Sequence, residues 1–271
     1  MAANLTSLKD VEAFTFDIFG TTVDWRSSVV QELSLRAFRK LSSVHNGSSQ
    51  NPTSEAHLEA MTDKHWADFA QEWRSSYIEF AANFNPDQDE WKSVDQHHQD
   101  SLEDLLKKWQ LGGCYNDSEI ESLSLVWHRL DPWADTRDGI KALRRTCTVA
   151  ALSNGNTSLL RDLCDFGDFS FNHIYSAEDF KAYKPNPKTY LGAVNDMGLE
   201  PRQVAMVAAH LDDLKAAASC GLRTVYIERP GEEAWDPKGE QYRHAKEWVD
   251  LWISKEEQGV LKLAQSIQTL T

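Results

Sequence analysis

Apolar and polar positions alternate along the chain in a pattern typical of strands joined by helices. Short apolar runs, each followed by polar or glycine-rich loop residues, occur at residues 13–17, 146–152, 171–175, 204–208 and 222–227. Segments with apolar residues at intervals of three and four lie at residues 136–145, 157–166, 187–197 and 213–220. Strands that alternate with helices of this length predict βαβ units and a parallel sheet.

More than a hundred residues separate the first predicted strand from the second, and their spacing is helical. Helical segments are predicted at residues 27–41, 57–84, 89–109 and 117–130, with polar breaks at 46–52, 85–86 and 112–113. A parallel crossover needs only about a dozen residues, so a folded unit must be inserted here. We therefore predict an α/β protein, with a Rossmann-like parallel sheet core flanked by helices (residues 1–26 and 136–271) and an inserted all-helical cap (residues 27–135).

The residues after Pro230 predict one more helix, and the composition excludes some classes of partner. After Pro230 the pattern predicts an acidic loop and a final helix at residues 256–267. Lys and Arg number 28 against 42 Asp and Glu, a formal net charge of −14, which argues against nucleic acid and anionic membranes as partners. No apolar stretch approaches the roughly 20 residues of a membrane span.

The amino-terminal residues and the cysteines indicate in which cellular compartment the protein is expected. Residues 1–10 lack the basic and apolar segments of a secretory signal. Four cysteines without C-x-x-C spacing predict reduced thiols and no structural zinc. We expect a cytoplasmic protein that binds a small molecule.

Polar residues gather where the predicted strands end. The four clusters are Asp17 with Thr21 and Thr22, Ser153 with Asn154, Lys184 alone, and His210 with Asp212 and Asp213. Each cluster by itself is compatible with a helix cap, a turn or a surface charge. Because the carboxyl ends of parallel strands meet at one edge of a sheet, the four together predict a catalytic crevice there.

Four segments resemble, in order and spacing, the haloacid dehalogenase superfamily, and within it the type II (L-type) 2-haloacid dehalogenases. They are residues 16–26, 152–155, 182–185 and 207–214. The likeness extends into the predicted cap through residues 72–74. It implies hydrolytic dehalogenation of short 2-haloalkanoic acids, such as haloacetate and 2-halopropionate, to 2-hydroxy acids. It also implies a small-molecule haloacid as the partner and no metal or other cofactor, and it is compatible with a homodimer.

The resemblance assigns roles that suit the chemistry of the residues. Asp17 would attack the carbon that carries the halogen, with inversion at C2, and form an ester that water then opens. Lys184 would keep Asp17 ionised, since an ammonium within about 4 Å favours the carboxylate. Thr21 offers a hydroxyl to an anionic oxygen.

Five further residues would bind the substrate. By resemblance, Ser153 and Asn154 hold the substrate carboxylate, and Arg74 in the cap lies near the departing halide. Tyr190 follows Lys184 by six residues, as the active-site tyrosine of the family does. Phe19 adds an apolar side chain two positions after Asp17. Arg74 and Tyr190 are equally compatible with ordinary helix packing.

One cluster departs from the pattern of well-described members. They carry Ser-x-Asn-x-x-Asp where residues 208–213 of this chain read Ala-Ala-His-Leu-Asp-Asp. Asp213 keeps the position of the acidic residue thought to activate water, and His210 replaces an amide with a ring that titrates near neutral pH. Either residue could be the base, and the sequence leaves the choice open.

Two other functions remain open. Phosphatases of the superfamily typically carry a second Asp two positions after the nucleophile to protonate the leaving alcohol, and Phe19 cannot do so. A Mg²⁺-dependent phosphohydrolase with an unusual acid is one alternative, with Asp17 and Asp213 near the cation. A catalytically silent protein that binds a small carboxylate is the other.

Overall fold

The computed structural model describes residues 5–44 and 52–270 and is built on one parallel sheet. Its strands run in the order β3-β2-β1-β4-β5-β6, and each pairs in parallel with its neighbours. They are β1 (Ala13–Phe16), β2 (Thr148–Ser153), β3 (His173–Ser176), β4 (Val204–Ala208), β5 (Arg223–Ile227) and β6 (Leu251–Ile253). The parallel α/β sheet that the pattern predicts is confirmed, with β1 near its centre.

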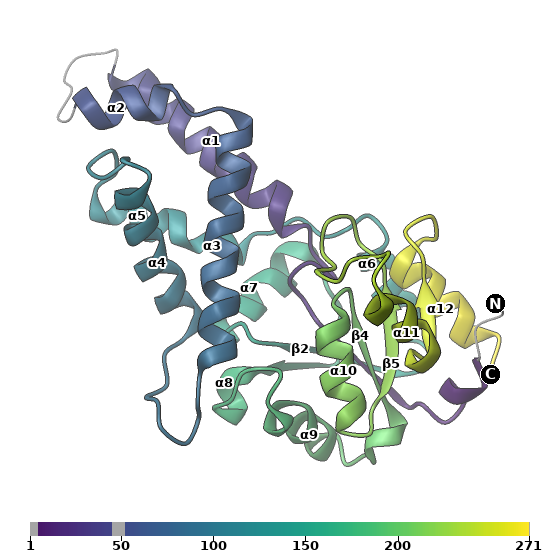
Figure 1. Ribbon diagram of the computed structural model, residues 1–271. Helices are drawn as coiled ribbons and strands as arrows, with labels where there is room; N and C mark the ends of the chain where they lie inside the picture. Colours follow the sequence, from purple (N-terminus) through teal and green to yellow (C-terminus); the bar gives the residue numbers. More distant parts are fainter. Residues whose placement is uncertain (1–4, 45–51, 271) are drawn as a thin grey trace.

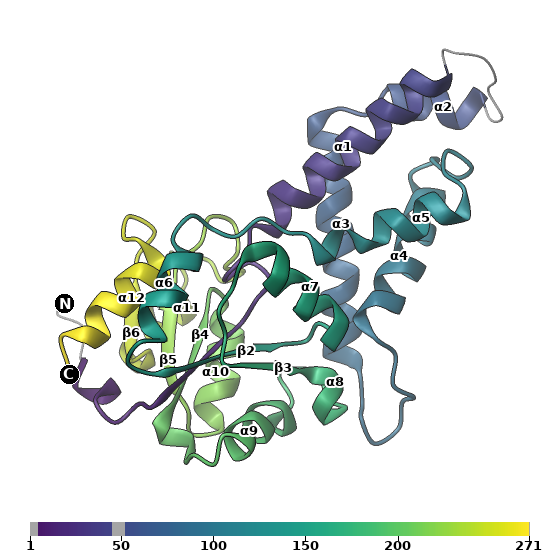
Figure 2. The same cartoon turned by 180° about the vertical axis from the view of Figure 1, so that it is seen from behind.

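Helices cover both faces of the sheet. Those on one face are α6 (Thr136–Leu143), α7 (Thr157–Gly167) and α12 (Gly259–Gln268); those on the other are α9 (Pro187–Asp196), α10 (Leu211–Ser219) and α11 (Glu240–Trp248). Figures 1 and 2 show the two layers from opposite sides. Successive strand residues point to opposite faces, so Phe14 and Phe16 pack with the first set and Ala13 with the second. Both faces are apolar, as expected for a sheet covered on both sides.

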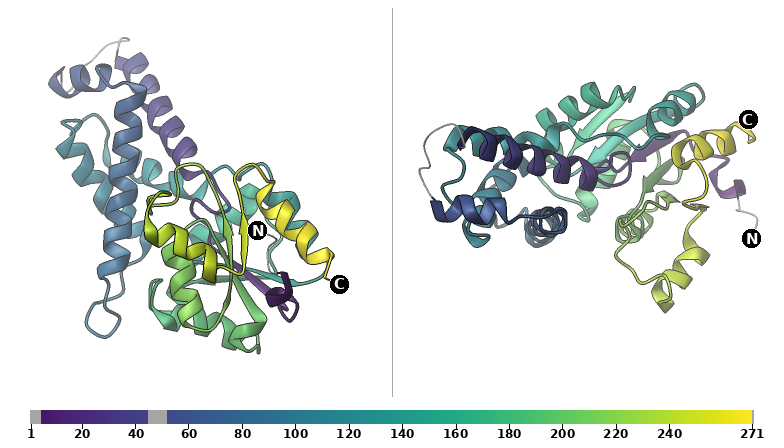
Figure 3. Two further views of the ribbon diagram at one scale, coloured as in Figure 1. Left: turned by 45° about the vertical axis from the view of Figure 1, so that its right-hand side comes forward. Right: turned by 90° about the horizontal axis from the view of Figure 1, so that it is seen from above.

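A group of helices inserted after β1 extends from the sheet as an all-helical cap (Figure 3). They are α1 (Trp25–Val44), α2 (Pro52–Glu59), α3 (Asp63–Asn83), α4 (Val94–Lys108) and α5 (Asp117–Ser124), followed by the 3₁₀ turn η2 (Leu125–His128). Trp73 and Trp127 are fully buried and pack edge to face in its interior. The boundaries at residues 27 and 135 stay a prediction, and most of the predicted break at 46–52 lies outside the described residues.

Other elements differ from the pattern. The single helix predicted at 57–84 is wrong: α2 ends at Glu59, and Thr62 begins α3 with a capping box that includes His65. The helix predicted at 117–130 ends at Ser124, where the 3₁₀ turn follows. The tail also contains α11 and β6, in a region where the sequence pattern predicted only an acidic loop before the final helix. Short elements complete the chain: η1 (Leu5–Leu8), α8 (Ala177–Phe180) and η3 (Pro201–Gln203).

A buried histidine joins the cap to the sheet domain. His128 Nδ1 lies 2.7 Å from Asp162 on α7, and its Nε2 lies 3.0 Å from Asp95 on α4. Asn156, which precedes α7, donates to the other oxygen of Asp95 at 2.7 Å. Burial lowers the pKa of His128, but the two carboxylates outweigh it and raise the pKa above the usual value. These contacts fix the cap over the carboxyl edge of the sheet.

All four cysteines are free, as the sequence predicts. Within residues 5–44 and 52–270, no helix is long and apolar enough to cross a membrane.

Candidate active site

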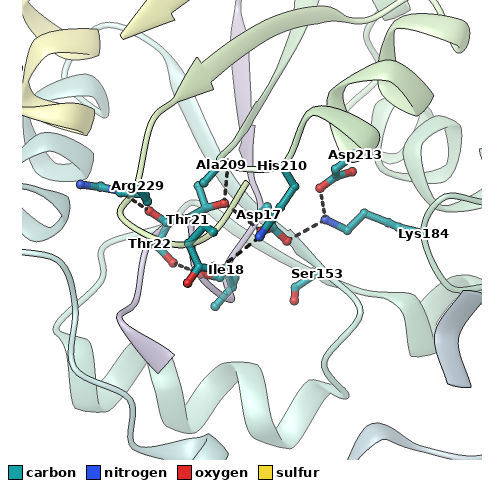
Figure 4. A network of polar contacts seen from close by, with 12 residues as sticks. Asp17, Ile18, Thr21, Thr22, Ser153, Lys184, Ala209, His210, Asp213 and Arg229 are labelled. Atoms are coloured by element: carbon teal, nitrogen blue, oxygen red, sulfur yellow. Dashed lines mark hydrogen bonds and ion pairs between the residues drawn. The ribbon is translucent and has the colours of Figure 1, made fainter. Parts of the chain in front are cut away.

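Asp17 stands directly after β1, in the middle of the carboxyl edge of the sheet (Figure 4). Its backbone N–H donates to Val207 O at 3.0 Å, which extends the pairing of β1 with β4 by one bond. The chain then turns at Gly20, whose φ of 86° favours glycine. This turn brings the Thr21 hydroxyl to Asp17 Oδ2 at 2.8 Å, while Ala209 N–H donates to the same hydroxyl at 2.9 Å. The carboxylate is therefore held by two loops.

Lys184 lies between two carboxylates. Its Nζ is 2.8 Å from Asp17 Oδ1 and 2.6 Å from Asp213 Oδ2 (Figure 4). Asn154 fixes the lysine backbone, because its Oδ1 accepts from Lys184 N at 2.7 Å and its Nδ2 donates to Lys184 O at 3.3 Å. Burial favours neutral forms, yet the ammonium lowers the pKa of Asp17 and the carboxylates raise the pKa of Lys184. Asp17 and Lys184 are therefore both charged at neutral pH.

Tyr190 holds Asp213, the second carboxylate that contacts Lys184. Its hydroxyl, on α9, donates to Asp213 Oδ1 at 2.5 Å. Burial and the carboxylate both raise the pKa of Tyr190, so the phenol keeps its proton. Both oxygens of Asp213 consequently have a donor, one from Tyr190 and one from Lys184.

His210 contacts Asp17 from the other side. Its Nδ1 is 3.3 Å from Asp17 Oδ2, and its Nε2 is 3.3 Å from Glu232 Oε2. Burial lowers the pKa of His210, but the hydrogen bonds to Asp17 and Glu232 outweigh it and raise the pKa to about 9. The ring is therefore an imidazolium at neutral pH.

Glu232 is a site residue that the sequence did not reveal. Its Oε2 also accepts from Trp25 Nε1 at 3.0 Å. A side chain at Gly20 would clash with this carboxylate, so the glycine makes room for it. Glu232 follows β5, and the rule that polar residues gather after strands could have drawn attention to it.

Arg74 reaches the site from α3 of the cap. Its guanidinium carbon lies 5.4 Å from the ring centre of Phe19, 4.8 Å from that of Tyr77 and 5.6 Å from that of Trp25. The residue is buried, and within the described parts of the chain no carboxylate forms an ion pair with it. Aromatic faces hold a guanidinium without neutralising it, so Arg74 can pair with an anion.

These residues surround a cavity of about 610 Å³ between the cap and the strand ends. Its walls include Asp17, Phe19, Arg74, Asn154, Lys184, Tyr190, His210, Asp213 and Glu232. Two of the predicted site residues, Thr21 and Ser153, do not line the cavity. The Thr21 hydroxyl donates to Asp17, and the buried Ser153 Oγ accepts from Gly155 N at 3.3 Å. Direct contact of these two residues with a substrate stays a prediction.

The positions of Asp17, Lys184 and Asp213 also determine how well the site could bind a metal ion. A Mg²⁺ bound by Asp17 and Asp213 would lie between the two carboxylates, where the ammonium of Lys184 lies. Among the described residues, no group of three His, Cys, Asp or Glu side chains is arranged to hold a metal. The donor set therefore fits Mg²⁺ poorly.

Residues 11–221 match the family model of the haloacid dehalogenase-like hydrolases. The chain belongs to this family. Among curated haloacid dehalogenases, (S)-2-haloacid dehalogenase 1 of Pseudomonas sp. (strain CBS-3) is 29% identical over 163 residues. That match covers 54% of this chain and 72% of the relative.

Two solved structures of the family agree with this chain over nearly its whole length. An L-2-haloacid dehalogenase is 32% identical, with a TM-score of 0.76, and the match covers 96% of this chain and 99% of that one. A defluorinating L-2-haloacid dehalogenase is 28% identical, with a TM-score of 0.76, and the match covers 95% of each chain. The sheet domain and the helical cap are thus the fold of haloacid dehalogenases.

Proposed function

We propose that the protein hydrolyses the carbon–halide bond of short 2-haloalkanoic acids, such as haloacetates and 2-halopropionates, to 2-hydroxy acids. One observation carries the proposal. An ionised Asp17, held by Thr21 and Lys184, faces a cavity whose cap side presents the buried guanidinium of Arg74. The names of the relatives, which are 2-haloacid dehalogenases, support the same substrate class.

In the first step Asp17 attacks C2 of the substrate. Its low pKa keeps the carboxylate charged, and the contacts of both oxygens hold it in one orientation. The new bond joins an oxygen of Asp17 to C2 while the carbon–halide bond breaks with its electron pair on the halide. Arg74, beside the aromatic ring of Phe19, receives that anion. Attack opposite the halide inverts C2, so L-2-chloropropionate yields D-lactate.

In the second step water opens the aspartyl ester. The water oxygen bonds to the carboxyl carbon of Asp17, and the bond from that carbon to the ester oxygen breaks. The 2-hydroxy acid leaves with the oxygen that Asp17 contributed, and the carboxylate is restored. Lys184 stabilises the negative charge that develops in this step, because its ammonium is 2.8 Å from Asp17 Oδ1.

A halide leaves without a proton, which suits an active site with Phe19 two positions after the nucleophile. Neither step requires a metal or another cofactor, and we propose none. Asn154 lines the cavity and Ser153 lies behind it, at the side where we place the substrate carboxylate.

Halide release with and without a chelator tests this function. The protein is incubated with chloroacetate or L-2-chloropropionate, in buffer or with EDTA, and p-nitrophenyl phosphate is tested in parallel. We expect chloride release at the same rate in EDTA, and no phosphate release. Phosphate release that EDTA abolishes, without chloride release, would assign the protein to the phosphohydrolases. Binding of the haloacid without chloride release would make it a binding protein.

A further inference from the structure

His210 has a different partner on each of its ring nitrogens. Nδ1 faces the nucleophile, 3.3 Å from Asp17 Oδ2, and Nε2 faces Glu232 Oε2 at 3.3 Å. Glu232 is itself fixed, because Trp25 donates to it and Gly20 leaves it room. A histidine whose far nitrogen is oriented by a carboxylate is the arrangement that general bases use in hydrolytic enzymes.

The other candidate base is engaged elsewhere. Asp213 accepts from Lys184 Nζ at 2.6 Å and from Tyr190 Oη at 2.5 Å. Both of its oxygens are therefore engaged, one by Lys184 and the other by Tyr190. His210 Nδ1, in contrast, is in contact with an oxygen bonded to the carbon that water must attack.

We propose that His210 is the base of the ester-opening step and that Glu232 positions its ring. This inference rests on the proposed function, in which Asp17 carries the substrate as an ester. His210 is a catalytic residue in this account, since it touches the reacting carboxyl group. Glu232 acts through His210 and is a positioning residue.

Formation of the ester turns the imidazolium into a base. The ester of Asp17 carries no charge, so His210 loses one of the two carboxylates that hold its proton. The Nδ1 proton passes to the solvent, which accounts for the one proton that the net hydrolysis releases. Neutral Nδ1 then takes a proton from the attacking water as its oxygen bonds to the ester carbon. The leaving oxygen of the 2-hydroxy acid takes the second proton of the water, and both the imidazolium and the carboxylate are restored.

Charged groups from several elements surround this ring. Asp17 follows β1, Glu232 and Glu233 belong to the loop after β5, and Arg74 of α3 interacts with Glu232. With Asp17 esterified, Glu232 is the remaining carboxylate in contact with the ring among the described residues. In the ester, burial lowers the pKa of His210 and the contact with Glu232 raises it.

Rapid mixing of His210→Asn with excess chloroacetate tests the base. We expect a burst of one chloride per chain, followed by turnover slower than the parent by about 10²–10⁴-fold. Intact-mass measurement should find one carboxymethyl group on the chain, located at Asp17. His210→Gln, a second amide variant, should behave in the same way and provides the test if the first does not fold.

Glu232→Gln tests the positioning role. We expect ester opening to slow by about 10–100-fold, and its acid limb to move to lower pH, because removing the carboxylate lowers the pKa of His210. Glu240→Gln is the matched control for the same chemical change. Glu240 is exposed at the start of α11 and has no role in the proposed reaction, so its variant should keep the parent rate and pH profile.

The outcomes separate this inference from the proposed function. No chloride from the parent protein would overturn the proposed function. Steady turnover of His210→Asn and His210→Gln at the parent rate, with no ester detected, would overturn the role of His210 alone. A lost chloride burst in these variants would do the same, because it would place His210 in halide displacement. An unchanged pH profile in Glu232→Gln would overturn the positioning role of Glu232.

Discussion

Asp17→Asn is expected to release halide from 2-haloacids at least about 10⁴-fold more slowly than the parent. An amide nitrogen or oxygen is a far weaker nucleophile than the carboxylate, which Lys184 and His210 keep ionised by lowering its pKa. The fold should survive, because the amide oxygen can still accept from Thr21. Chloride release from L-2-chloropropionate, followed with a halide electrode, measures the effect.

Asp212→Asn is the control for this substitution. It makes the same chemical change at the first turn of α10, and Asp212 has no role in the proposed reaction. Its chloride release should remain within about twofold of the parent, as for surface substitutions in general. An Asp17→Asn protein that turned over as fast as Asp212→Asn would exclude Asp17 as the nucleophile.

Lys184→Met should impair both activity and stability. Loss of the ammonium removes the cation that Asp17 and Asp213 share in a buried site, and breaking a buried ion pair in this way destabilises a protein by about 3–5 kcal/mol. Lys184 lowers the pKa of Asp17, so this pKa rises in the variant and a smaller fraction of the nucleophile is charged at low pH. We expect chloride release to fall by about 10³-fold and its acid limb to move to higher pH. Urea unfolding and a pH–rate profile measure the two effects.

Lys188→Met serves as the matched control. Lys188 is exposed on α9 and pairs only with the exposed Asp87, at 3.4 Å, among the described residues. Surface pairs of this kind contribute about 0–1 kcal/mol. Equal losses of stability in the two lysine variants would contradict the account of Lys184 as the cation between two buried carboxylates.

The sheet could be predicted from the sequence because its strands are buried and continuous. Residues 204–208 are apolar throughout, and β4 occupies these positions. The central strands bury both faces, which leaves an apolar run with clear polar ends. β6 spans only Leu251–Ile253, too short for a periodic pattern, and its residues are recognisable as a strand only through pairing with β5.

The cap was harder to predict at the level of single helices. Residues 57–84 keep helical spacing across the gap between α2 and α3, so periodicity alone joins them. The break depends on the capping hydrogen bonds of Thr62, which a hydrophobic pattern does not contain. Helical content could be predicted, but the point at which the chain turns could not.

Some residues of the candidate site could likewise be predicted from the sequence, and others could not. Asp17, Lys184 and Asp213 each follow a strand of one sheet, and their convergence follows from parallel topology. Glu232 belongs to a loop whose path is set by tertiary contacts with Trp25 and Gly20. His210 could be named from the sequence as a candidate base, but its two carboxylate partners become visible only in the folded chain.

A single turnover in ¹⁸O-labelled water tests the central claim, that Asp17 forms an ester with the substrate. The protein is mixed in excess with chloroacetate, and the label is located by mass spectrometry in the glycolate and in the chain. We expect unlabelled glycolate and one ¹⁸O in the side chain of Asp17, because water attacks the aspartyl carbon. Labelled glycolate from an unlabelled chain would show direct attack by water on C2, and would contradict the ester mechanism.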